Sequence, residues 1–184
     1  MNTNKAKGFV FMAQSIDGFV ARKNHDIDWL MKYDTHGEDH GYNNFIKEID
    51  VLVMGTGSYK TVLGFDTWPY TIPVCVLSST LRQKDIPEEL QGKVSISGET
   101  PVELMQRLFE VGYKNVYIDG GRVVQSFIKE ELIKEITITI IPILIGAGKR
   151  MFGRIENDID FRLMESKSFS KSGFVQNHYK ILNT

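Results

Sequence analysis

The chain contains little of several residue types, and each shortage limits what it can be. Its 184 residues include one cysteine, Cys75, so no intrachain disulfide can form and a reducing compartment, the cytoplasm, is expected. No apolar run is long enough to span a membrane, and the polar start from Met1 to Lys5 does not resemble a signal peptide. We therefore expect neither a membrane partner nor a targeting segment.

Neither sign of charge is in excess. The chain has 22 lysines and arginines against 23 aspartates and glutamates, a formal net charge of -1 at pH 7. A nucleic-acid-binding domain usually carries a basic face, so this balance argues against a nucleic-acid partner and favours a small molecule. The four histidines are scattered without metal-ligand spacing, and with a single cysteine they predict no metal site.

The chain also lacks repeats, low-complexity tracts and linkers rich in proline or glycine. Hydrophobic residues make up 42% and charged residues 24%, which is typical of globular proteins. A domain of this length can bury roughly 70% of the surface of its unfolded chain. We expect one domain over residues 1–184.

Hydrophobic patterns predict alternating strands and helices. Thr100-Pro101-Val102-Glu103 combines an N-cap, a first-turn proline and a capping-box acid, and Gly112 suits the end of that helix. Further helices are expected over residues 38–48, 58–63 and 122–129. Strands are expected over residues 8–14, 51–54, 74–77, 94–97, 115–118 and 136–145, the last bent at Pro142, with an antiparallel hairpin over 161–169 and 174–182. This order predicts an α/β fold with a mainly parallel sheet.

Two glycine-containing turns each join a buried strand to a helix. The strand ending at Ile118 leads through Asp119-Gly120-Gly121 into one helix, and Met54 leads through Gly55-Thr56-Gly57-Ser58 into another. Glycines let the free N–H groups at a helix start approach an anion. Leu77-Ser78-Ser79 ends a third strand, and ligands of open α/β sheets bind beyond such strand ends. The turns predict a phosphate-bearing ligand, and a tight turn without any ligand is the alternative for each.

These motifs, in this order, resemble the dihydrofolate-reductase-like superfamily. The resemblance is greatest to small bacterial reductases similar to the reductase domain of the riboflavin-biosynthesis deaminase-reductase, and residues 13–18, 53–55, 77–79, 118–121 and 141–148 carry it. It implies a three-layer α/β fold with helices on both faces of the sheet. It also implies a homodimeric NADPH-dependent oxidoreductase that reduces a small heterocyclic or carbonyl substrate, of the 5-amino-6-(5-phosphoribosylamino)uracil or the dihydrofolate type.

The resemblance also implies which residues contact the cofactor. The diphosphate is assigned to Gly55, Thr56, Gly57 and Ser58 on one side and to Gly120, Gly121, Arg122, Val123 and Val124 on the other, and the adenosine ribose to Leu77, Ser78 and Ser79. Ala13 would leave room for the nicotinamide, although close packing also explains a small residue. The family often has a basic residue at the position of Thr56, suited to the 2′-phosphate. Arg122 or Arg82 is the candidate replacement, and NADH stays possible.

The substrate side is less clearly marked. The resemblance places Asp17 near the nicotinamide, as a catalytic acid or substrate ligand, and its alternative is to shape the turn before Gly18. Trp29 and Trp68 are expected to line or cover the substrate cleft, with core packing as the alternative.

Dihydrofolate reductases carry a carboxylate on the helix before the second strand. The aligned position here is near Gly41 or Tyr42, so Tyr42 is the candidate substrate contact and folate reduction is disfavoured. Asp39 reaches the site only if the helix over residues 38–48 starts early. The alternative role for Asp39 is to complement the dipole at the start of that helix. The missing acid and Thr56 also support a second hypothesis, a nucleotide-binding homodimer of the same fold without turnover, for which the strand over residues 136–145 could supply an interface.

Overall fold

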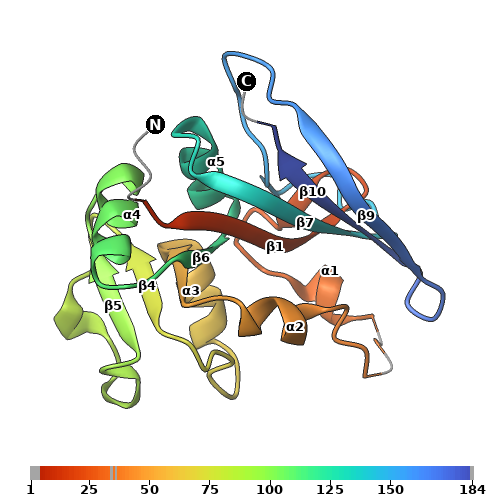
Figure 1. Ribbon diagram of the computed structural model, residues 1–184. Coiled ribbons are helices and arrows are strands. Elements are labelled where there is room, and N and C mark those ends of the chain that lie inside the picture. The colour runs from red at the N-terminus through yellow and green to blue at the C-terminus, as the bar shows by residue number, and fades with distance from the viewer. Residues whose placement is uncertain (1–4, 34, 36, 183–184) are drawn as a thin grey trace.

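An eight-stranded sheet organises the molecule (Figure 1), and the computed structural model describes residues 5–33, 35 and 37–182. The strand order is β5 (Val94–Ser97), β4 (Val74–Leu77), β3 (Val51–Gly55), β6 (Asn115–Asp119), β1 (Lys7–Ser15), β7 (Ile133–Ile141), β10 (Phe174–Ile181) and β9 (Phe161–Phe169). The first six of these strands are parallel, whereas β10 runs antiparallel to β7 and β9. The predicted parallel sheet with a C-terminal antiparallel hairpin is confirmed.

Helices cover both faces of the sheet. Helices α4 (Pro101–Glu110) and α5 (Gly121–Lys129) share a core with Val51 and Val53 of β3. Leu52 and Met54 point to the other face, where they pack with α2 (Tyr42–Lys47) and α3 (Thr56–Leu63). A strand buried on both faces needs apolar side chains at successive positions, and the run at β3 supplies them. The predicted three layers are confirmed.

Helix α4 shows how closely local sequence can set a helix start. The Glu103 N–H donates to Thr100 Oγ1 (3.4 Å), and the Thr100 N–H donates to Glu103 Oε2 (2.9 Å), which completes the predicted capping box. Gly112 follows the helix with φ +97°, the left-handed conformation that glycine adopts readily.

The strand predicted over residues 136–145 is shifted toward the N-terminus. Strand β7 spans Ile133–Ile141, ends before Pro142, and lies between β1 and β10 in the middle of the sheet. Proline cannot donate to the ladder, and the amides of Ile145 and Gly146 instead donate to the Asp17 carboxylate. The strand is thus a central one, which is the alternative explanation of its composition, and a role in a dimer interface stays a prediction.

Two helices also differ from their predicted bounds. Helix α2 begins at Tyr42 rather than at residue 38, because His40 (φ +49°) and Gly41 (φ +85°) are left-handed. Asp39 accepts hydrogen bonds from the amides of Gly41 and Asn43 there, so it caps the helix. Helix α3 begins at Thr56, two residues before the expected start.

The remaining elements are short. Strands β2 (Phe19–Ala21) and β8 (Lys149–Arg150) form a small antiparallel pair beside the main sheet, α1 (Asp28–Met31) follows β2, and the 3-10 turns η1 (Gln83–Asp85) and η2 (Glu88–Leu90) precede β5. Within the residues that the structure describes, no helix combines the length and apolar character needed to cross a membrane.

The topology places two helix starts at neighbouring strand ends. Strands β3 and β6 are adjacent, with Met54 beside Asp119, yet the chain leaves β3 through α3 on one face and leaves β6 through α5 on the other. On the far side of β6, β1 pairs with β6 only as far as Phe9, while it follows β7 to Ser15. Parallel α/β sheets bind ligands at the topological switch point, where the order of the strands reverses. The ends of β3 and β6 lie at such a point.

Candidate active site

The two glycine turns face each other across the ends of β3 and β6. A Cβ atom on Gly120 would lie 2.7 Å from Ser58 Oγ, and one on Gly55 would lie 3.1 Å from Val123 Cγ2. Gly120 has φ +90°, which side-chain-bearing residues rarely adopt. The predicted convergence of the two turns is therefore present in the structure, and only glycine fits at its closest point.

The first turns of α3 and α5 leave their N–H groups available. Neither Gly55 nor Gly120, the residues at the N-caps, has a side chain to accept them, and among the described residues no other side chain caps either helix. Helix α4, by contrast, satisfies its own amides through Thr100 and Glu103. Free amides at two facing helix starts suit an anion such as a diphosphate, so the backbone of this edge fits the predicted cofactor.

The predicted cofactor residues divide into backbone and side-chain groups. Val123 and Val124 are buried in the core, whereas Arg122 is exposed. The Val124 N–H donates to the Gly120 carbonyl (2.9 Å), so of these two valines only Val123 has an amide that can face a ligand. Ser78 follows β4, and its hydroxyl accepts from the amides of Thr80 and Leu81. Thr56, Gly57 and Ser58 are half-buried in the first turn of α3, and Leu77 and Ser79 flank the end of β4.

Arg82 is committed to its own loop. Its guanidinium donates to the carbonyl oxygens of Ser79 (3.1 Å) and Leu81 (3.0 Å). It does not turn toward Thr56 as a replacement for the missing basic side chain.

A polar pair, the buried Tyr117 and the half-buried Asp119, lies beside the turns and was not predicted. The Tyr117 hydroxyl, buried on β6, donates to the carbonyl oxygen of Phe11 (2.7 Å) and lies 3.4 Å from Asp119 Oδ1. Burial raises the pKa of the Asp119 carboxyl, against the opposing effect of a hydrogen bond with Ser58. Its position before Gly120 was the available signal in the sequence, but the tyrosines around it come from distant segments.

The charge of Asp119 acts on three tyrosines. Burial, followed by the charge of Asp119, raises the pKa of Tyr42, Tyr70 and Tyr117. Tyr42, the predicted substrate contact, begins α2 and packs edge-on against the Phe11 ring at 5.8 Å. The helix before β3 thus supplies a phenol rather than a carboxylate near the site.

A cavity of about 350 Å³ opens beside β1 and β7. Ala13 lines it, as expected for a residue that leaves room for a ring, and Thr139 stands opposite Ala13 in the register. Asp39 and His40 also line the cavity, where the imidazole lies between the rings of Phe169 and Phe174. The remaining lining residues are Phe11, Leu30, Met31, Tyr33, Thr35, Ile141 and Phe174.

The tryptophans occupy packing positions. Trp29 is 1% exposed and packs with Ile141 and Phe174 behind the cavity without lining it. Trp68 is half-buried against Tyr59 and Tyr70. Core packing, the alternative considered for both, describes where they lie, and a role for Trp29 in substrate binding stays a prediction.

Asp17 fastens two loops together. Its carboxylate accepts hydrogen bonds from the Ser15 hydroxyl (2.6 Å) and from the amides of Gly146 (2.7 Å) and Ile145 (3.3 Å). The Ser15 hydrogen bond is the main cause of a lowered pKa, with the amides assisting. An acid that delivers protons needs the opposite shift, so this geometry favours the turn-shaping alternative for Asp17.

A larger hollow, of about 650 Å³, lies far from these strand ends. It is bounded by the end of α5, the start of β7 and residues 154–160. The amino ends of parallel strands do not carry the ligand sites of such folds, so we place the candidate site at the glycine turns and the smaller cavity. The structure brings no three potential metal-ligating side chains together within its described ranges, 5–33, 35 and 37–182.

Together, the fold and the paired glycine turns define a dihydrofolate-reductase-like domain. The chain belongs to the RibD C-terminal domain family, whose model matches residues 6–174. It is 31% identical over 176 residues to the protein YwjB of Bacillus subtilis (strain 168), covering 94% of this chain and 97% of that protein.

Two solved structures show the same fold. A putative riboflavin biosynthesis protein from Shewanella sp. PV-4 is 36% identical, with a TM-score of 0.89 over 96% of this chain and 99% of that one. The deaminase and 5-amino-6-(5-phosphoribosylamino)uracil reductase of Thermotoga maritima is 12% identical, with a TM-score of 0.76 over 97% of this chain and 57% of that longer one. The chain thus corresponds to about half of the two-activity protein.

Proposed function

We propose that the chain is an NAD(P)H-dependent reductase that transfers a hydride to a C=N or C=O group of a small heterocycle. The observation that carries this proposal is the pair of uncapped helix starts that meet at Ser58 and Gly120. The family and the solved relatives support reductase chemistry on an aminopyrimidine-like compound. NADPH is the proposed donor, with NADH as the alternative because Thr56 replaces the usual basic residue.

Each part of the site then has one task. The amides of residues 56–58 and 121–123 bind the diphosphate, and Ala13 leaves space for the nicotinamide at the 350 Å³ cavity. When bound, the cofactor supplies the hydride. Catalysis rests mainly on holding the acceptor carbon close to the donor, with the cavity residues Phe11 and Thr139 orienting the ring.

The acceptor also needs a proton. Among the carboxyl groups at this edge, Asp119 has a pKa raised by burial, whereas hydrogen bonds hold the pKa of Asp17 low. We therefore transfer the proposed acid role from Asp17 to Asp119, with Tyr117 fixing its carboxyl.

A binding titration and a turnover panel test the proposal. Purified protein is titrated with NADPH and NADH while fluorescence transfer from tryptophan is followed, and oxidation of each is then measured with aminopyrimidines, pterins, flavin precursors and quinones. Saturable binding with oxidation by at least one acceptor is expected. Binding without oxidation by any acceptor would favour the nucleotide-binding protein without turnover, and absence of binding would exclude both.

A further inference from the structure

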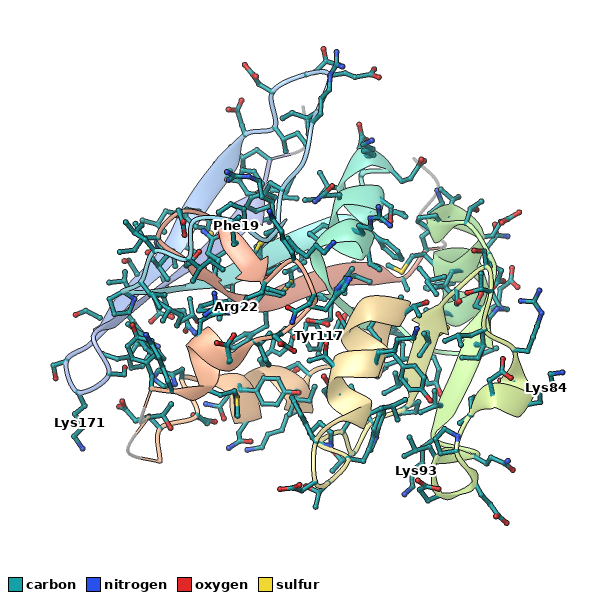
Figure 2. The ribbon with its side chains drawn as sticks, turned by 180° about the vertical axis from the view of Figure 1, so that it is seen from behind. Phe19, Arg22, Lys84, Lys93, Tyr117 and Lys171 are labelled. Carbon is teal, nitrogen blue, oxygen red and sulfur yellow. The ribbon has the colours of Figure 1, made fainter. Side chains whose placement is uncertain are left out.

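Residues 22–28 form a closed loop that lies against the turn at Gly55–Ser58. The Arg22 N–H donates to the Asp26 carbonyl (2.9 Å), the His25 N–H donates to the Arg22 carbonyl (3.0 Å), and the Arg22 guanidinium pairs with the Asp28 carboxylate. Thr61 of α3 donates through its hydroxyl to the His25 carbonyl (3.2 Å). Figure 2 labels Arg22, the first residue of this loop, and Phe19, which begins β2 just before it. The loop thereby holds His25 at its tip.

The His25 ring occupies the space above Gly57. A Cβ atom on Gly57 would lie 2.7 Å from both Nδ1 and Cε1 of the imidazole, so a side chain at residue 57 would have to displace the ring. His25 has φ +75°, a conformation that histidine tolerates better than most residues but at some cost. A histidine from a distant segment therefore stands where a side chain of the turn itself would project.

The charged groups that act on the ring come from three further elements and are all cations. They are Lys149 of β8, Arg122 of α5 and Lys60 of α3. Other lysines, such as Lys84, Lys93 and Lys171, stand at the periphery (Figure 2). Cations that converge on a histidine repel its charged form, an arrangement that becomes favourable when an anion joins them.

We propose that His25 is a phosphate-binding residue of the cofactor site, donating a hydrogen bond from the 22–28 loop to the diphosphate held by the Gly55–Ser58 turn. The inference rests on the proposed function and deepens it. The diphosphate, rather than the 2′-phosphate, is the expected partner because the ring contacts Gly57 within the turn itself. His25 thus adds a side-chain donor to the amides of this turn.

If His25 contacts the diphosphate, the protein should take up a proton when the dinucleotide binds. Desolvation, and then Lys149, Arg122 and Lys60, lower the pKa of His25 and so disfavour its charged form in the free protein. A diphosphate beside the ring raises that pKa, and binding then takes up a proton. Affinity for the dinucleotide consequently rises as the pH falls.

The test measures binding rather than turnover. Dissociation constants for NADH are determined from pH 6 to pH 8 for the native protein and for His25→Asn, since asparagine tolerates the left-handed conformation but does not titrate. NADH is the better probe because the 2′-phosphate of NADPH itself titrates near pH 6. His178→Asn is the matched control, since His178 lies on β10 beside Glu135. Proton uptake is measured by calorimetry in two buffers of different ionisation enthalpy.

The native protein and His178→Asn are expected to bind NADH about tenfold more tightly at pH 6 than at pH 8, with proton uptake. For His25→Asn, the affinity for NADH should not change with pH. At pH 6 this variant should bind NADH and NADPH more weakly than the native protein, by a similar factor for both. A native profile already flat, an unchanged profile in His25→Asn, or a loss confined to NADPH would overturn the assignment of His25 to the diphosphate. If the native protein binds neither dinucleotide, the proposed function itself fails, so the two failures are distinguishable.

Discussion

Ser58 Oγ lies 2.7 Å from the point that a Cβ atom on Gly120 would occupy, although 62 residues separate the two in the chain. The contact brings the start of α3 against the start of α5 at the switch point of the sheet. The left-handed backbone and the lack of space together exclude a side chain at residue 120.

Replacement of Gly120 by alanine should therefore damage the site in two ways. The left-handed backbone alone costs about 1–2 kcal/mol, and the methyl group also displaces Ser58. We expect NADPH affinity to fall about tenfold or more, a loss of about 1.4 kcal/mol, measured by fluorescence titration.

Gly112→Ala is the control, because Gly112 has a similar φ of +97° and a Cβ atom there would have no other atom within 4 Å. It should lose stability but keep its affinity. Adding Ser58→Ala to Gly120→Ala should recover part of the lost stability, because it removes the Oγ atom that clashes. Equal affinity losses in both single glycine variants would show that strain, not the shape of the site, is responsible.

Asp119→Asn should stabilise the fold at neutral pH. A carboxyl whose pKa is raised on folding contributes stability below its ordinary pKa of 3.8 and loses it as the pH rises through the folded value. Removing the charge should raise stability by about 1 kcal/mol at pH 7, with a smaller gain at pH 5, measured by thermal unfolding. Turnover should fall at the same time. A variant less stable than the native protein at pH 7 would contradict the burial of an unfavourable charge at this position.

Asp17→Asn separates the two roles considered for Asp17. Because the pKa of Asp17 is lowered, its carboxylate stabilises the fold above its ordinary pKa of 3.8, and that contribution is lost as the pH falls through the lower folded value. The variant should melt at a lower temperature at pH 7, and the difference should narrow toward pH 3. A proton-delivering acid would instead show an unchanged melting temperature and a turnover loss of about a hundredfold or more.

Thr100→Ala should affect stability alone. Loss of the N-cap of α4 costs about 1 kcal/mol, which lowers the melting temperature by about 2–4 °C in a domain of this size. NADPH affinity should stay unchanged, because α4 starts beyond β5, away from the glycine turns. A change in affinity would contradict this expectation. It would show that the start of α4, after β5, is energetically coupled to the glycine turn after β6, although their hydrogen-bond networks are separate.

Much of the fold was predictable because local and tertiary preferences agree. The apolar runs of β3, β4 and β6 are buried on both faces of a parallel sheet, so their composition identifies them, and Thr100 and Glu103 cap α4 by contacts three residues apart. The two glycine turns were predictable for the same reason, since each follows such a strand directly.

The remaining features depend on contacts between distant segments. Strand β7 ends at Ile141 because Pro142 interrupts it and Asp17 engages the next amides, and α2 starts late because Gly41 turns left-handed. The site residues that were missed, Asp119 and His25, gain their character from neighbours far away in the sequence. No periodicity in the chain places Tyr42 beside Asp119 or an imidazole above Gly57.

The position of β1 also bears on how the protein is made. This strand leaves the ribosome well before both of its neighbours, because β6 and β7 are synthesised roughly a hundred residues later. An apolar strand must therefore wait, unpaired, until most of the chain has emerged, and such late closure is associated with slow folding and with exposure to aggregation. The yield of folded protein during rapid expression should accordingly depend strongly on chaperones. The equilibrium stability of the folded protein alone would not indicate this dependence.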